Sequence, residues 1–191
     1  MEALKAWIQR EGIVLGPEFL RVDGFLNHRI NPEFVGLAGE GLAASYAGRG
    51  ITCVLTAEAA GNVIAYEVAR RLGACALYAK KGQAITMDNA VSCGLRSPTK
   101  GTQQELFLCR DYLAEGERVL VVDDFLHRGI TSAALAQMVL QCGAELAGFG
   151  FVIEKCFSGG RAQLEAFGVP IVALAPITHM DPESGRVEFA E

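Results

Sequence analysis

The chain has 191 residues, of which 51% are hydrophobic, and 22 acidic against 17 basic side chains give it a formal net charge of −5. This length and apolar content predict one domain, spanning residues 1–191, with a sizeable core, and the acidic balance argues against nucleic-acid binding, which normally shows a basic face. The sequence has no apolar run of the length that a membrane span needs, and its start, with Glu2 in a polar amphipathic pattern, is not that of a signal peptide.

The six cysteines are scattered without a C-x-x-C pair and stand mostly in apolar surroundings. Metal sites and disulfide frameworks use characteristic spacings that this chain lacks. We therefore expect reduced cysteines in the core of a cytoplasmic protein. They are Cys53, Cys75, Cys93, Cys109, Cys142 and Cys156.

The N-terminal part is predicted to contain two helices separated by an irregular segment. Residues 1–12 place apolar side chains on one helical face, while Asn31 and Pro32 suit the N-cap and first position of the second helix. The segment between the helices is too broken by glycine and proline for a long element. We expect residues 1–30 to form a hood over a site.

Two apolar strands are predicted at residues 51–55 and 74–79, and each is followed by residues suited to phosphate. The turn at 56–62, TAEAAGN, is rich in small residues, which let backbone N–H groups approach an anion closely. Lys80 and Lys81 follow the second strand and are either solvated or available to neutralise a diphosphate. Phosphate-binding features elsewhere in the chain favour the diphosphate.

A long polar segment extends from residue 82 to residue 100 before the chain returns as a strand at 104–109. Such an excursion is typical of a mobile flap, which we place at residues 80–104. Its polar residues include Thr86, Asp88, Ser97, Thr99 and Lys100.

The most informative stretch is VLVVDDFLHRGITS, at residues 119–132. Its first four residues have the length and β-branched content of a strand buried on both faces. Asp123 and Asp124 then fall at the carboxyl end of the strand, where open α/β sheets bind ligands. Two adjacent carboxylates accept hydrogen bonds from the vicinal hydroxyls of a ribose or hold a hydrated Mg²⁺.

Two other interpretations of this acidic pair are weaker. An isolated pair before a glycine is more often a solvated turn, but the hydroxyls of Thr131 and Ser132 at the next helix start favour a site. An acidic pocket of the receiver-domain kind needs a phosphoacceptor Asp at a later strand end, where this chain has Lys155 and Pro176.

The residues after the carboxylates form a predicted anion cradle. The backbone N–H groups can converge there because Gly129 permits positive φ and Thr131 opens a helix. An acidic pair followed by such a cradle predicts a site for ribose 5-phosphate. The phosphate-binding residues are His127, Arg128, Gly129, Ile130 and Thr131.

The C-terminal third completes the predicted sheet. A helix with Leu135 and Met138 on its buried face follows the cradle, and the next strand delivers Glu154 and Lys155 to the same sheet edge as the acidic pair. The remaining predicted elements are that strand at 147–153, a short helix at 159–168, a buried strand at 169–175 and a short strand at 187–189 in a polar tail.

These features together resemble the type I phosphoribosyltransferases, and the sequence DDFL narrows the resemblance towards the bacterial xanthine phosphoribosyltransferases. The resemblance covers nearly the whole chain, and several separated matches in the right order are far more specific than one loop. The matching segments are MEALK at the start, VDGFLNHRINP at 22–32, TAEAAGN at 56–62, residues 80–102 and GFGFVIEKCF at 148–157.

The resemblance implies an α/β fold with a mostly parallel sheet flanked by helices, a small N-terminal hood and a flexible flap that closes over 5-phosphoribosyl 1-diphosphate (PRPP). It implies phosphoribosyl transfer to a 6-oxopurine, most closely xanthine, giving XMP and diphosphate in purine salvage. Asp123 and Asp124 then act as catalytic residues beside the ribose, and Mg²⁺ is held through PRPP with no dedicated protein ligands. A homodimer is implied because flaps of this family work against a neighbouring subunit.

Two alternatives stay open beside xanthine transfer. The first is the same reaction on guanine, hypoxanthine or adenine. The second is a non-catalytic regulator that senses PRPP, although the chain shows neither the extension nor the basic surface that nucleic-acid binding would require.

The same resemblance assigns three residues to the purine. The hood places Leu20 and Asn27 against the base, and Lys155 stands where the family has a lysine beside the 6-oxo group. The Asn27 amide suits a dioxopurine edge because it both donates and accepts. The ammonium of Lys155 favours a carbonyl oxygen over an exocyclic amine, which selects oxopurines over adenine.

The chain departs from the family pattern at two places. The family usually has hydroxyls where Ala59 and Ala60 stand, so diphosphate contacts there depend on the backbone. It usually has small or neutral residues where His127 and Arg128 stand, so these side chains either strengthen phosphate binding or point outward.

Overall fold

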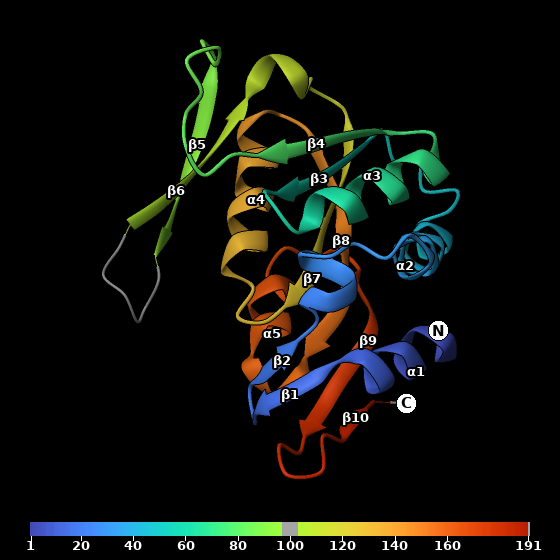
Figure 1. Cartoon of the computed structure of the whole chain (residues 1–191). Helices are drawn as coiled ribbons and strands as arrows, with labels where there is room; N and C mark the ends of the chain where they lie inside the picture. Colours follow the sequence, from blue (N-terminus) through green and yellow to red (C-terminus); the bar gives the residue numbers. More distant parts are fainter. Residues whose placement is uncertain (97–102, 191) are drawn as a thin grey trace.

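The computed structural model describes residues 1–96 and 103–190, and its centre is a six-stranded sheet (Figure 1). Neighbouring strands are parallel except for the antiparallel pair at one edge. This arrangement confirms the predicted mostly parallel α/β fold. The spatial order is β10 (Val187–Phe189), β9 (Ile171–Met180), β8 (Glu145–Lys155), β7 (Arg118–Leu126), β3 (Cys53–Ala57) and β4 (Cys75–Ala79).

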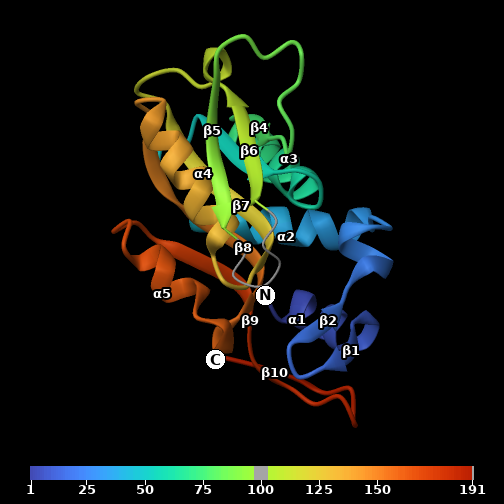
Figure 2. The ribbon, with the colours of Figure 1, turned by 90° about the vertical axis from the view of Figure 1, so that its left-hand side faces the viewer.

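Helices cover both faces of the sheet (Figures 1 and 2). The helices α1 (Glu2–Glu11), α2 (Pro32–Ser45) and α3 (Gly61–Leu72) pack on one face, and α4 (Ile130–Gln141) and α5 (Gly160–Glu165) pack on the other. Each face has its own apolar core, which explains why residues 119–122 of the central strand β7 are all apolar. In β7 the side chains of Leu120 and Val122 enter the first core, and those of Val119 and Val121 enter the second.

Two strands extend further than the sequence predicts. The strand predicted at 119–122 continues to Leu126, because Phe125 and Leu126 still pair with β8. Asp123 and Asp124 therefore lie within the C-terminal half of β7 and not beyond its end. Likewise, β9 continues through Pro176 to Met180, because the antiparallel partner β10 pairs with its C-terminal half.

The hood has more regular structure than its sequence indicates. The segment after α1 forms the hairpin β1 (Ile13–Gly16) and β2 (Phe19–Arg21), followed by a π-helical turn at Asp23–Asn27. Its apolar side chains pack on α2, where the ring centroids of Phe25 and Phe34 lie 4.7 Å apart. Asn31 caps α2 as predicted, since its side chain accepts hydrogen bonds from the N–H groups of the first turn.

A second hairpin stands beside α4 (Figures 1 and 2) and consists of β5 (Ala90–Arg96) and β6 (Gln103–Cys109). The sequence did not predict β5. Leu95 and Leu106 are buried between the hairpin and α4. The part of the predicted flap that contains Leu95 therefore contributes to the core. Part of the predicted flap, at residues 97–102 with Ser97, Thr99 and Lys100, lies outside the described residues.

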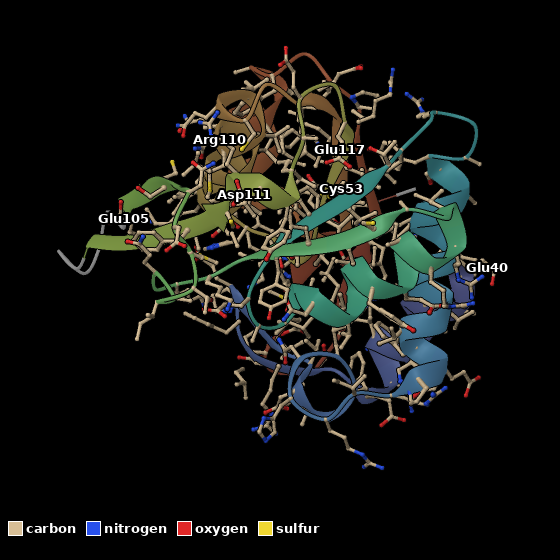
Figure 3. The ribbon with its side chains drawn as sticks, turned by 90° about the horizontal axis from the view of Figure 1, so that it is seen from above. Glu40, Cys53, Glu105, Arg110, Asp111 and Glu117 are labelled. Atoms are coloured by element: carbon tan, nitrogen blue, oxygen red, sulfur yellow. The ribbon has the colours of Figure 1, made fainter. Side chains whose placement is uncertain are left out.

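All six cysteines are free, but only three of them are buried. The expected core position is wrong for Cys75, which lies on the edge strand β4, and for Cys156, which follows β8; both are exposed. Figure 3 shows Cys53 on β3 close to Glu117, and burial, together with that carboxylate, raises the pKa of the Cys53 thiol to about 12. Within the described ranges, no helix is long and apolar enough to cross a membrane.

Candidate active site

A cavity of about 400 Å³ lies where the carboxyl ends of β3, β4 and β7 meet the N-termini of α3 and α4. It brings together the acidic pair, part of the small-residue turn, one of the two lysines and Thr131 of the phosphate cradle. The other four predicted cradle residues, 127–130, do not line it. The lining residues are Asn27, Ala57, Glu58, Ala59, Ala60, Lys81, Leu95, Leu106, Asp123, Asp124 and Thr131.

The two carboxylates face different neighbours. Asp123 lies against the start of α3, where a Cβ added to Gly61 would be 3.0 Å from Asp123 Oδ1. Asp124 faces the hood, and its Oδ2 accepts a hydrogen bond of 3.2 Å from Asn27 Nδ2. The pair therefore presents acceptors in two directions, as two vicinal ribose hydroxyls require.

The electrostatics of the pair are set by burial and by mutual repulsion. Burial and the adjacent charge of Asp124 raise the pKa of Asp123 well above its usual value, while Lys81 acts in the opposite direction. A buried carboxylate that ionises reluctantly is more easily kept charged when a cation develops beside it. The site is therefore suited to stabilising positive charge.

The turn between β3 and α3 is built for close backbone approach. The Glu58–Ala59 peptide bond is cis, and α3 begins at Gly61 with no side-chain cap. A Cβ at Gly61 would lie 1.9 Å from Oγ1 of the buried Thr56, so this position accepts only glycine. The Asn62 N–H donates to the Ala59 carbonyl oxygen, but no side chain caps this helix end, so the N–H group of Gly61 remains available to an anion.

Glu58 is a cavity residue that the sequence analysis missed. Its Oε1 accepts a 2.6 Å hydrogen bond from the backbone N–H of Lys81, which joins the ends of β3 and β4. The signal for it was present, because Glu58 is the acidic residue of the small-residue turn that the sequence assigns to diphosphate. Of the two predicted cations only Lys81 lines the cavity, whereas the Lys80 backbone pairs with Phe107 of β6.

The phosphate cradle has the predicted geometry at its glycine. Gly129 has φ +72° and immediately precedes α4, whose first turn has no side-chain cap. Thr131 lines the cavity, while Ser132 is buried. The N-terminus of α4 therefore offers free backbone donors and a hydroxyl beside Asp123 and Asp124.

The two basic side chains of the cradle differ. His127 is half-buried, and burial together with the positive charges of Lys155 and Arg128 lowers its pKa. Its imidazole is therefore neutral at pH 7. Arg128 is exposed and carries the positive side-chain charge of the cradle.

A second cavity, of about 280 Å³, is lined by residues of the hood and adjoins the first through Asn27, which lines both. Leu20 also lines it, so two of the three predicted purine residues lie beside the predicted PRPP site. The lining residues are Leu15, Phe19, Leu20, Arg21, Val22, Asp23 and Asn27.

Lys155, the third predicted purine residue, ties the hood to the sheet. Its Nζ donates a 2.6 Å hydrogen bond to the Glu18 carbonyl oxygen and lies 5.3 Å from the ring centroid of Phe125. Burial lowers the pKa of Lys155, and nearby Glu18 acts in the opposite direction. In the described part of the chain it lines neither cavity, but it stands between the hood and β7.

Glu154 lies at the same end of the sheet as the acidic pair, as predicted, but its side chain does not face the cavity. Glu154 is only 2% exposed, and its carboxylate accepts two hydrogen bonds from Arg161 at the start of α5. Successive side chains of a strand point to opposite faces, so Glu154 turns into the protein where Lys155 turns towards the hood. Arg161 was missed because nothing in the local sequence marks it as a partner.

The chain is similar over its full length to proteins named xanthine phosphoribosyltransferase. It is 41% identical to that of Pseudomonas entomophila over 192 residues and 43% identical to that of Heliobacterium modesticaldum over 190 residues, with 100% of both chains covered in each case. No family model matches the chain.

The fold is shared with solved phosphoribosyltransferases. Adenine phosphoribosyltransferase from Rhodothermus marinus superimposes with a TM-score of 0.77 at 22% identity, covering 92% of this chain and 99% of that one. The structural likeness supports the fold alone, whereas the full-length sequence identity shows the family. The chain belongs to the xanthine phosphoribosyltransferase family, within the type I phosphoribosyltransferases.

Proposed function

We propose that the protein is a pentosyltransferase that moves the 5-phosphoribosyl group of PRPP to N9 of xanthine, releasing diphosphate and forming XMP. One observation carries the proposal: Asp123 and Asp124 lie in one cavity between the uncapped N-termini of α3 and α4. The anion site at the N-terminus of α3, the acidic pair and the anion site at the N-terminus of α4 lie in the same order as the diphosphate, the ribose and the 5-phosphate of PRPP. The names of the full-length relatives support xanthine as the base.

The catalytic step requires positioning and charge stabilisation. Breaking the bond between ribose C1 and diphosphate leaves a carbon with oxocarbenium character, and no protein nucleophile is needed. Asp123 and Asp124 bind the ribose hydroxyls and hold negative charge beside that carbon. The turn at 57–61 and Lys81 bind the departing diphosphate.

Mg²⁺ fits this cavity as a companion of PRPP. Carboxylate oxygens are donors that a hard cation prefers, and Glu58, Asp123 and Asp124 line the cavity, where they would face a cation that PRPP carries in. Within residues 1–96 and 103–190, no group of three acidic, His or Cys side chains is arranged to hold a metal ion. Mg²⁺ bound through PRPP would neutralise the diphosphate as it leaves.

The base is bound between the hood and the sheet. Leu20 contacts the purine plane, and the Asn27 amide pairs with its mixed donor and acceptor edge. Lys155 uses one of its three N–H donors for Glu18, which leaves donors for the 6-oxo group. One ammonium can thus anchor the hood and select an oxopurine.

The remaining assignments follow from this function. Residues 1–30 act as the hood, and residues 80–104 act as the flap that excludes water from PRPP, within one phosphoribosyltransferase domain at 1–191. The protein works in purine salvage in the cytoplasm, which the free and partly exposed cysteines support. It acts as a homodimer, and sedimentation that detects only monomer would remove this assignment.

The test is nucleotide formation from PRPP and Mg²⁺ with xanthine, guanine, hypoxanthine and adenine in parallel, with diphosphate release measured. We expect the highest kcat/KM for xanthine. Preference for another base would retain phosphoribosyl transfer and overturn the base assignment. PRPP binding without turnover of any base would overturn the enzyme assignment in favour of a PRPP-sensing regulator.

A further inference from the structure

The loop that binds the 5-phosphate is supported from behind by the first turn of α5. We propose that Gly160 and Arg161 are positioning residues for this loop, which comprises residues 127–129. The inference rests on the proposed function, because it assigns the loop to the 5-phosphate of PRPP. Neither residue lines a cavity within the described chain.

Two glycines make the contact reciprocal. A Cβ added to Gly160 would lie 2.0 Å from the His127 carbonyl oxygen and 2.9 Å from the His127 carbonyl carbon. A Cβ added to Gly129 would lie 2.8 Å from the Gly160 carbonyl oxygen and 3.4 Å from Gly160 Cα. The two backbones therefore touch directly, at a separation that excludes any side chain between them.

The contact cannot be relieved by rotating a side chain, because it joins one main chain to the other. An alanine at position 160 must displace either the His127 peptide or the start of α5. The N–H groups of the cradle bind phosphate only while they converge on one point. A shift of the His127 peptide therefore weakens phosphate binding without touching the phosphate.

The start of α5 is the better anchored side of this contact. Arg161 donates from Nε to Glu154 Oε1 at 2.8 Å, from Nη2 to Glu154 Oε2, and from Nη1 to the Ile171 carbonyl oxygen at 3.2 Å. Glu154 is on β8 and Ile171 begins β9, so one guanidinium fixes α5 to two sheet strands. Leu164, which belongs to α5, is also fully buried.

The anchoring of α5 gives a role to the ion pair between the buried Glu154 and Arg161. Glu154 at 2% exposure would be costly without a partner, and a bidentate arginine satisfies both of its oxygens. The same arginine fixes the position at which Gly160 contacts the phosphate loop. A structural ion pair thereby acts on substrate binding through backbone contact.

The experiment compares two small inhibitors that occupy opposite ends of the PRPP site. Ribose 5-phosphate reports the cradle, and inorganic diphosphate reports the turn at 57–61. In Gly160→Ala we expect the inhibition constant of ribose 5-phosphate and the KM for PRPP to rise about tenfold. The inhibition constant of diphosphate and the KM for xanthine stay within about twofold, since those groups bind elsewhere.

Gly36→Ala is the matched control, because Gly36 lies in α2 with nothing within 4 Å of an added Cβ. It should leave both inhibition constants unchanged. If Gly160→Ala does not fold, Arg161→Lys tests the proposal instead. Lysine keeps a positive charge for Glu154 but loses the bidentate guanidinium, so the inhibition constant of ribose 5-phosphate should rise about threefold.

The outcomes separate this inference from the proposed function. Wild-type enzyme that forms no nucleotide overturns the proposed function. Active wild-type enzyme with an unchanged ribose 5-phosphate constant in the folded variant overturns the positioning role alone. Equal weakening of ribose 5-phosphate and diphosphate also overturns it, because that pattern reports general loss of structure.

Discussion

The carboxyl edge of the sheet and the hood meet at the first cavity, which residues of both line, but they are held in place by different forces. Asp123 and Asp124 belong to β7, which is paired with β8 as far as Leu126 but with β3 only as far as Val121, and which is packed between two apolar cores. The hood rests on the apolar side chains of α1 and of its π-helical turn, and beside the acidic pair it reaches the sheet through Asn27 to Asp124 and Lys155 to Glu18.

This difference separates the residues that stabilise charge during the reaction from the residues that select the base. A carboxylate on a strand packed between two cores keeps its position when its neighbours change, which is what charge stabilisation at C1 requires. The part of the hood beside the acidic pair, where two polar contacts join it to the sheet, can adjust to the base that enters there. Changes at the sheet edge should therefore reduce the rate, whereas changes at the hood should alter binding of the base.

The largest effect is expected for Asp123→Asn, which removes the buried charge beside C1 but keeps the side-chain shape. We expect kcat/KM for PRPP to fall at least about 100-fold, because fixed electrostatic groups of this kind contribute factors of about 10²–10³. Steady-state kinetics with saturating xanthine measure it. Activity near that of the wild type would show that Asp124 alone stabilises the charge.

The same variant should be more stable than the wild type. The pKa of Asp123 is raised in the folded protein, so at neutral pH its ionised form costs folding free energy, and this cost disappears as the pH falls through the raised pKa. Asp123→Asn should therefore raise Tm at pH 7, by about 2–4 °C for each kcal/mol relieved. The gain should shrink towards pH 4, and a lower Tm at pH 7 would contradict the burial argument.

On the hood side, Lys155→Met should have the next largest effect. Methionine keeps an unbranched apolar stem between Phe19 and Phe125 but removes the ammonium. Loss of a charged hydrogen bond of about 1.5–3 kcal/mol predicts a KM for xanthine raised about 10- to 100-fold. The KM for PRPP should change less than about twofold, and an equal rise in both would assign Lys155 to hood packing only.

Asn27→Ala tests the contact between the two regions. A neutral hydrogen bond contributes about 0.5–1.5 kcal/mol, so the KM for xanthine should rise about 2- to 10-fold. The removed amide also releases Asp124 Oδ2. If the KM for PRPP changes more than the KM for xanthine, Asn27 acts mainly on the ribose carboxylate and not on the base.

The sheet edge could be predicted from sequence because its determinants are local. Four apolar residues followed by Asp123 and Asp124 indicate a buried strand that brings this pair near its carboxyl end, and the positive φ of Gly129 follows from the residue type. The N-cap at Asn31 was predictable for the same reason. Each of these features depends on a few neighbouring residues.

The features that were missed depend on contacts between distant segments. The hairpin strand β5 is stabilised by α4, with Leu95 buried against that helix, so its own weak alternation gave no sufficient signal. The inward orientation of the Glu154 side chain depends on the register of β8, because a shift of one residue would turn each side chain to the opposite face of the sheet. The contact of Lys155 with Glu18 joins residues 137 positions apart, and no local pattern encodes it.

The smallest effect is expected at the exposed rim of the sheet edge, in Arg128→Ala. The neutral His127 leaves Arg128 as the charged side chain of the cradle, so its loss should raise the KM for PRPP about three- to fivefold at low salt. Because Arg128 is exposed, this difference should decrease in 0.5 M salt, where charge interactions are screened over a few ångströms. An unchanged KM at low salt would mean that Arg128 points outward and that the α4 N-terminus alone holds the phosphate, which would make the sheet edge independent of its surface side chains.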